Sequence, residues 1–185
     1  TSQQESVSDE KSSGIQLDAF NRDTLLRIYR YKTAYYSFYL SVALGMEMVE
    51  IEDESQYAIA KSICVAIGEY FQAQDDFLDC FGDPEVIGKV GTDIEDNKCT
   101  WLMVEALEVA SESEKQLILK HYGRKNPSDV QIIKDLYTKL DIQSKFQAFE
   151  QQSYDSILQL IENAKPIMPV DAFLFLLHKV YKRSK

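Results

Sequence analysis

The chain has 185 residues, of which 45% are hydrophobic and 27% charged, and its formal net charge is −10 at pH 7. This composition is ordinary for one globular domain with a real core, and the negative balance argues against non-specific nucleic-acid binding. The three cysteines, Cys64, Cys80 and Cys99, form no C-x-x-C pair, which favours a reducing, cytoplasmic compartment over a disulfide framework.

The start of the chain is polar. Val7 is the only aliphatic residue among residues 1–14, so we expect residues 1–17 to be a disordered leader or an inter-helix loop and residues 18–185 to form the domain. The longest apolar stretch, 35–46, is interrupted by Ser37, Ser41 and Gly45. It is shorter than the ~20 residues of a membrane span, so we expect no span.

Apolar residues recur at helical spacing through most of the chain, and no stretch alternates as a strand would. We therefore predict an all-α fold. A first helix should run from Asp18 or Asn21 to about residue 48, and a second from 56 to 81, stopped by Gly82-Asp83-Pro84. Thr92 and Glu95 have capping-box spacing, which predicts a third helix from Thr92 to about 110. Shorter helices are expected at 112–121, 127–139, 142–163 and 169–182.

The second predicted helix carries an acidic stretch. Residues three and four apart share a helix face, so we expect Gln72, Asp75, Asp76 and Asp79 to form one polar patch. Three carboxylates together need a positive partner if they are buried. Oxygen ligands without Cys or His favour Mg²⁺, which uses one or two carboxylates and completes its shell with water and phosphate. The alternative is a solvated acidic helix face.

Lysines could supply the opposite wall of such a site. Lys32 and Thr33 lie mid-helix in a tyrosine-rich stretch, where an amine is unusual unless it meets an anion or extends to solvent. Lys89 lies between two glycines, and Lys98 follows at a spacing that would place it in the third helix. These lysines could bind a polyphosphate opposite the metal, or they could be ordinary surface charges. The basic tail 179–185 could solubilise the chain or cover an anionic site.

Three segments carry a resemblance to a known family. They are YKTAYYSF (31–38), FQAQDDFLDCFGDPEVIGKVGTDIEDNKCTWL (71–102) and YKRSK (181–185). Together they resemble the farnesyl diphosphate synthases of the polyprenyl synthase family, in order along nearly the whole chain from about Asp18. The resemblance implies an isoprenoid synthase helical bundle, a homodimer and Mg²⁺. It also implies condensation of isopentenyl diphosphate with dimethylallyl and then geranyl diphosphate.

The resemblance also implies roles for individual residues. Metal ligands would be Asp75, Asp76, Asp79 and Asp93, of which Asp75 would be catalytic with Lys32 and Thr33, the residues that stabilise the allylic cation. Substrate-binding residues would be Lys32, Thr33, Tyr36, Phe71, Gln72, Lys89, Lys98, Arg183 and Lys185. Among these, Phe71 would lie near the isopentenyl side, and Arg183 and Lys185 would belong to a tail that closes over isopentenyl diphosphate.

The chain departs from the family in one respect. Its single D-D-x-x-D matches the second aspartate-rich motif of the family, and a first motif followed by paired arginines is not found. We therefore expect the chain to be the C-terminal half of a synthase and to be inactive alone. Two alternatives are a non-catalytic fragment that acts only as a helical interaction module, and another Mg²⁺–diphosphate enzyme such as a terpene cyclase. The lysines and the basic tail favour the synthase over the cyclase.

Overall fold

The computed structural model describes residues 16–183. These residues form helices and connecting loops without a strand, which confirms the all-α prediction. The elements are η1 Leu17–Ala19, α1 Arg22–Tyr29, η2 Arg30–Tyr39, α2 Leu40–Met48, α3 Glu54–Phe81, α4 Pro84–Ile87, α5 Trp101–Val109, α6 Glu112–His121, α7 Pro127–Lys139, α8 Ile142–Ala164 and α9 Asp171–Val180. The expected leader lies outside the described residues except at its end, where Leu17 already begins η1.

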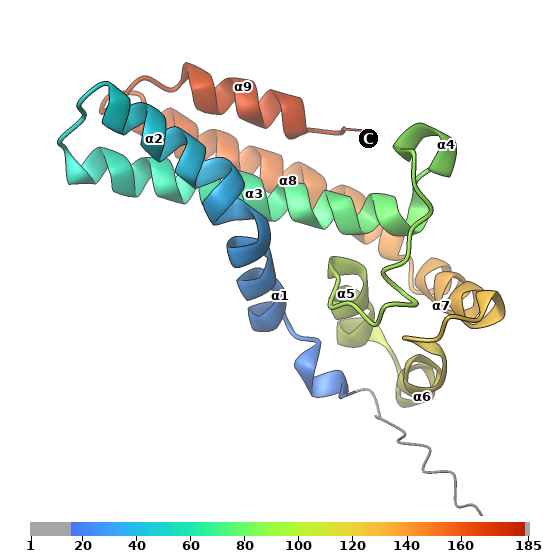
Figure 1. Cartoon of the computed structure of the whole chain (residues 1–185). Coiled ribbons are helices and arrows are strands. Elements are labelled where there is room, and N and C mark those ends of the chain that lie inside the picture. The colour runs from blue at the N-terminus through green and yellow to red at the C-terminus, as the bar shows by residue number, and fades with distance from the viewer. Residues whose placement is uncertain (1–15, 184–185) are drawn as a thin grey trace, which may run out of the picture.

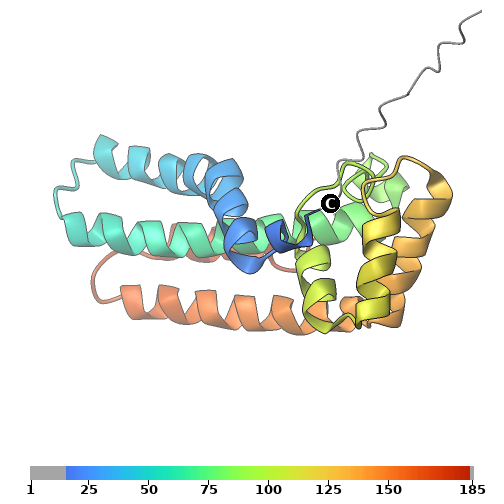
Figure 2. The same ribbon diagram turned by 90° about the horizontal axis from the view of Figure 1, so that it is seen from below.

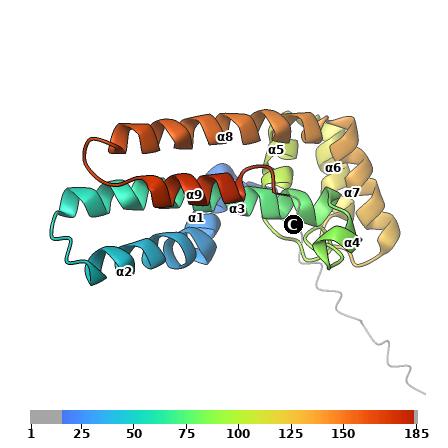
Figure 3. The ribbon, with the colours of Figure 1, turned by 90° about the horizontal axis from the view of Figure 1, so that it is seen from above.

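Helix α3 is the central element. It packs against α1, η2 and α2 on one side and against α8 and α9 on another, and α5 contacts it near its C-terminal end. The long helices lie roughly along one direction, while α5, α6 and α7 are gathered at the end where α3 finishes (Figures 1 and 2). α8 and α9 lie alongside α3, and the chain leaves α9 beside the last turns of α3 (Figure 3). This arrangement brings the acidic stretch of α3 close to the C-terminal segment.

The first predicted helix is present, but it is not a uniform α-helix. Asn21 caps it by accepting a hydrogen bond from the amide of Thr24 at 2.9 Å, and helical structure continues to Met48. The middle, η2, is wound as a π-helix, a rare form that is often found at functional sites. At its centre Ala34 meets Gly68 of α3 so closely that a Cβ on Gly68 would lie 2.6 Å from the Cα of Ala34.

The predicted start of the third helix is wrong. Residues 92–100 form a turn and a loop, and α5 begins at Trp101 with Thr100 as its N-cap. Thr92 does not cap a helix, because its hydroxyl donates to the Asp96 carboxylate at 2.9 Å. Asn97, at φ 55°, has a left-handed backbone that no α-helix accommodates. Lys98 therefore lies in a loop rather than inside a helix.

The buried side chains form two apolar clusters along α3. One surrounds the end near α5, α6 and α7 and includes Trp101, Tyr137 and Phe146. The other lies between the first half of α3, α8 and α9 and includes Ile67 and Leu177. Across residues 16–183, no helix combines the length and apolar character that crossing a bilayer requires.

Candidate functional site

A pocket of about 370 Å³ lies where the first helix meets α3 and the loop that precedes α5. Five residues singled out from the sequence line it: Lys32 of η2, Gln72 and Asp76 of α3, and Asp93 and Lys98 of the loop. Tyr29, Cys99 and Thr100 complete its polar wall. Two amines and two carboxylates from three separate segments therefore face one space.

Asp76 is the buried carboxylate of this pocket, with 5% of its surface exposed. It accepts hydrogen bonds from the Tyr29 hydroxyl and from the Trp101 amide, the latter at 2.8 Å at the first turn of α5. Burial raises the pKa of Asp76 from its ordinary 3.8 to about 7, against the opposing effects of the two hydrogen bonds and the Lys32 amine. A buried carboxyl with its pKa raised this far has a strong electrostatic preference for a further positive charge.

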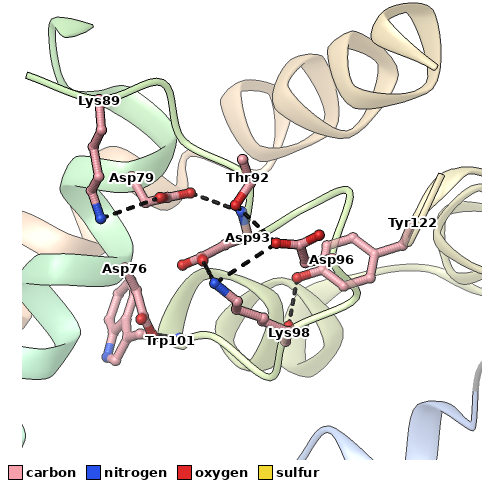
Figure 4. A network of polar contacts seen from close by, with 9 residues as sticks. All are labelled: Asp76, Asp79, Lys89, Thr92, Asp93, Asp96, Lys98, Trp101 and Tyr122. Carbon is pink, nitrogen blue, oxygen red and sulfur yellow. Dashed lines mark hydrogen bonds and ion pairs between the residues drawn. The ribbon is translucent and has the colours of Figure 1, made fainter. Parts of the chain in front are cut away.

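Asp79 and Asp93 link α3 to the loop. The Asp79 carboxylate accepts a hydrogen bond from the Asp93 amide at 2.9 Å, and the Lys89 amine lies 3.8 Å from it (Figure 4). Gly91 makes this possible, because a Cβ there would lie 1.8 Å from the Asp79 carbonyl oxygen. Gly91 thus lets the loop approach the backbone of α3 closely. Gly88 has a different role, because at φ 80° it ends α4 in the left-handed conformation.

Asp93 pairs with the lysine that the loop presents. The Lys98 amine donates to the Asp93 carboxylate at 2.7 Å (Figure 4), and the Tyr122 hydroxyl donates to the Lys98 carbonyl at 2.6 Å, which fixes the backbone beneath it. Burial raises the pKa of Asp93, while the Lys98 hydrogen bond lowers it. The Lys98 side chain is half exposed, so its amine remains accessible to a ligand.

Thr33 and Gln72 are joined behind the pocket. The Thr33 hydroxyl donates to the Gln72 side-chain oxygen at 2.7 Å, and both residues are buried. Lys32, the neighbour of Thr33, is exposed, so its amine reaches solvent. Its positive charge still acts on the pocket, where it opposes the rise that burial causes in the pKa of Asp76 and Asp93.

The remaining predicted residues that the structure describes lie outside this pocket, with Phe71 and Asp75 on α3, Tyr36 on η2 and Arg183 after α9. Asp75 is 3.6 Å from the Arg183 guanidinium, which stacks over the Phe71 ring at 3.8 Å from its centroid. Tyr36 is 63% exposed, and Lys185 lies outside the described residues. Within residues 16–183, no three acidic, His or Cys side chains converge at metal-binding distance. The expected single patch is therefore divided, with Asp76 and Asp79 toward the loop and Asp75 toward the C-terminal segment.

Several residues of the site were not found from the sequence. Tyr29 and Trp101 fix Asp76, although they are 47 and 25 positions away from it. The one available signal in the sequence is Thr100, a good N-cap residue directly before the apolar run from Trp101.

Comparison with known proteins identifies the relationship. The family model for polyprenyl synthetases matches residues 3–140. This chain belongs to the polyprenyl synthetase family. It is 46% identical over 173 residues to farnesyl pyrophosphate synthase of Gallus gallus and 51% identical over 160 residues to that of Zea mays.

The match covers 94% of this chain but 47% of the Gallus gallus protein, so the chain spans about half the length of the curated relatives it matches. A solved structure of Trypanosoma brucei farnesyl diphosphate synthase complexed with risedronate is similar as well. It superposes with a TM-score of 0.86 and 34% identity over 97% of this chain and 52% of that one. The helical arrangement is therefore that of a synthase of this family.

Proposed function

We propose that this chain forms the allylic-diphosphate wall of a farnesyl diphosphate synthase. This prenyltransferase would condense isopentenyl diphosphate with dimethylallyl and then geranyl diphosphate. The pocket carries the proposal, because Lys32 and Lys98 line it together with Asp76 and Asp93. A leaving diphosphate gains negative charge as its C–O bond breaks, and pre-positioned cations stabilise that charge.

The donor set of the pocket suits Mg²⁺. Burial raises the pKa of the Asp76 and Asp93 carboxyls, so a further positive charge nearby would favour their ionised form. Cys99 is no competitor for the metal, because burial raises the pKa of its thiol to about 11 and keeps it protonated. We propose Asp75, Asp76, Asp79 and Asp93 as the residues that hold Mg²⁺. When bound, the metal would supply positive charge that offsets the negative charge of the diphosphate.

The lysines would bind the diphosphate directly. Lys32 and Lys98 line the pocket, and the Lys89 amine lies 3.8 Å from the Asp79 carboxylate. Thr33 has a different role. Since its proton is donated to Gln72, its lone pairs are the part left to stabilise an allylic cation, together with the Lys32 carbonyl. Gln72, held by the same hydrogen bond, would orient the allylic diphosphate.

The other side of α3 would serve the second substrate. Phe71, with Arg183 stacked on its ring, forms an apolar surface with a cation above it. We assign this surface to binding near the isopentenyl site, and we propose Tyr36, Arg183 and Lys185 as further substrate-binding residues. Asp75 lies at its edge, so its carboxylate would have to leave Arg183 in order to hold a metal.

The proposal extends to the assembly and its place in the cell. We propose, as the family resemblance implies, that the complete enzyme is a homodimer. The cysteines are free, with Cys64 and Cys80 buried, which suits a reducing compartment, and we propose the cytoplasm.

A chimera tests the proposal. Residues 16–185 replace the matching half of the Gallus gallus relative, and product formation from labelled isopentenyl diphosphate and geranyl diphosphate is measured with Mg²⁺. We expect farnesyl diphosphate, and we expect Lys98→Gln to lower kcat/KM for geranyl diphosphate about 10- to 1,000-fold. Lys145→Gln, an exposed lysine on α8, is the matched control and should have no effect.

The outcome separates the proposal from its alternative. A chimera that folds and dimerises but forms no product would contradict the catalytic reading. It would favour a helical module that acts only through interactions.

A further inference from the structure

A buried chain of polar groups connects α8 to the C-terminal segment through α3. The Glu150 carboxylate on α8 accepts hydrogen bonds from the Tyr70 hydroxyl at 3.0 Å and from the Gln74 side-chain amide at 2.8 Å. The Gln74 oxygen in turn accepts a hydrogen bond from the Arg183 guanidinium at 3.3 Å. Tyr70 and Gln74 are 1% and 2% exposed, so water does not substitute for these partners.

The order of donors and acceptors in this chain admits one orientation of the Gln74 amide. A carboxylate only accepts and a guanidinium only donates, so the amide must point its NH₂ group at Glu150 and its oxygen at Arg183. Tyr70 reinforces this orientation. Its proton goes to Glu150, which leaves its oxygen to accept from the Gln74 NH₂ at 2.9 Å.

Without Glu150 the constraint disappears. The Tyr70 hydroxyl could then donate to the Gln74 oxygen, and the reversed amide would present its NH₂ group to Arg183. Two donors would face each other, and the Arg183 Nε–H would lose its acceptor.

At the other end of the chain, Arg183 holds the C-terminal segment on α3. Its guanidinium also donates to the Phe71 carbonyl at 3.2 Å and lies 3.6 Å from Asp75. The guanidinium side chain is 15% exposed. The turn that brings it there places Lys182 at φ 49°, a left-handed conformation that a lysine adopts at a cost. The position of the C-terminal segment on α3 therefore depends on the contacts of Arg183.

We propose that Glu150 is a positioning residue for the C-terminal segment. By fixing the Gln74 amide, it gives Arg183 its acceptor and so keeps the segment over Phe71 and Asp75. The consequence for substrate binding at that surface rests on the proposed function, but the positioning itself does not.

The test measures the Arg183 side chain directly. In the ¹⁵N-labelled 185-residue chain, the hydrogen-exchange rate of the Arg183 Nε–H is followed by NMR and assigned with Arg183→Lys. Glu150→Met removes the acceptor at similar size, and we expect the exchange to become about five-fold faster, as for loss of one hydrogen bond. Glu162→Met is the matched control, because Glu162 is on the same helix and pairs only with Lys165 among the described residues.

Two further variants separate positioning from a general loss of stability. Glu150→Gln keeps an acceptor oxygen, and its exchange should stay within about two-fold of the parent. Adding Gln74→Glu to Glu150→Met places a carboxylate next to Arg183 whichever way it turns, and it should restore slow exchange.

Unchanged exchange in Glu150→Met, or no restoration in the double variant, would overturn the proposal. Since no substrate is present, a failure here leaves the chimera experiment unaffected, and an inactive chimera leaves this result unaffected.

Discussion

The hydrogen bond between Thr33 and Gln72 gives a sharp test of how the pocket is built. Thr33→Val keeps the shape of the side chain but removes the donor, so the Gln72 oxygen, in a residue 3% exposed, loses its partner. A buried polar group without a partner costs about 1–3 kcal/mol. For a chain of this size, each kcal/mol lowers the melting temperature by about 2–4 °C. We therefore expect Thr33→Val to lower the melting temperature by about 2–12 °C.

The measurement is thermal and urea unfolding of the 185-residue chain, followed by circular dichroism. Thr138→Val is the matched control, because Thr138 is an exposed helical residue whose hydroxyl donates to the Lys134 carbonyl at 3.0 Å. Its substitution should change stability by no more than about 0.5 kcal/mol. If both variants lose the same stability, Gln72 is not held as described, and the role given to Thr33 loses its structural basis.

Three more predictions concern other parts of the molecule. Gly91→Ala should displace the loop from Asp79, since its Cβ would lie 1.8 Å from the Asp79 carbonyl, and the Asp93 amide should exchange hydrogen faster. Glu114→Gln should lower the melting temperature at pH 7. Its pKa is lowered to about 2 by hydrogen bonds from Ser111 and Lys139, so its contribution is present above pH 4.5 and is lost as the pH falls through 2. We expect the exposed leucines Leu40 and Leu44 to make the chain self-associate, so replacing both with Ser should reduce self-association in sedimentation velocity.

Each of these has an outcome that would contradict it. Unchanged exchange of the Asp93 amide would show that the loop has room for a side chain. A stability loss in Glu114→Gln that stays constant from pH 7 to pH 2 would rule out the carboxylate as its cause. Equal self-association before and after the leucine substitutions would show that the chains associate through another surface.

The helices could be predicted because their limits are local. Gly82 and Pro84 end α3 where the sequence indicates, and Asn21 caps the first helix. The predicted start of the third helix is wrong because the spacing of Thr92 and Glu95 does not by itself show that their side chains cap a helix. In the structure the Thr92 hydroxyl donates to the Asp96 carboxylate instead. The π-helical turns of η2 could not be predicted, since the spacing of apolar residues over ten positions does not separate them from α-helical turns.

The site was predictable in its chemistry but only partly in its geometry. The types of residue were right, since Lys32, Gln72, Asp76, Asp93 and Lys98 line one pocket. Their grouping was not, because adjacent residues of an α-helix point about 100° apart, and Asp75 therefore faces Arg183 while Asp76 faces Tyr29. Helix spacing alone does not reveal which partner each carboxylate meets, since the partners come from distant segments.

The last prediction concerns the 185-residue chain assayed by itself, which we expect to form no farnesyl diphosphate. An allylic cation survives only where water is excluded. In this chain the aromatic face of the first helix is open, with Tyr36 63% exposed, and the apolar stripe continues through Leu40, Leu44 and Met48 at intervals of four.

The matched relatives are about twice as long, and we expect a segment corresponding to their remaining half to cover this stripe. The assay uses labelled isopentenyl diphosphate, geranyl diphosphate and Mg²⁺, with the chain alone and mixed with the separately expressed N-terminal half of the Gallus gallus relative. Product from the chain alone would refute the requirement for a second wall. Product that appears only on mixing would show that the two halves assemble. Leu44→Ser should then lower product formation by the mixture without changing the pocket, which would assign the assembly to the exposed stripe.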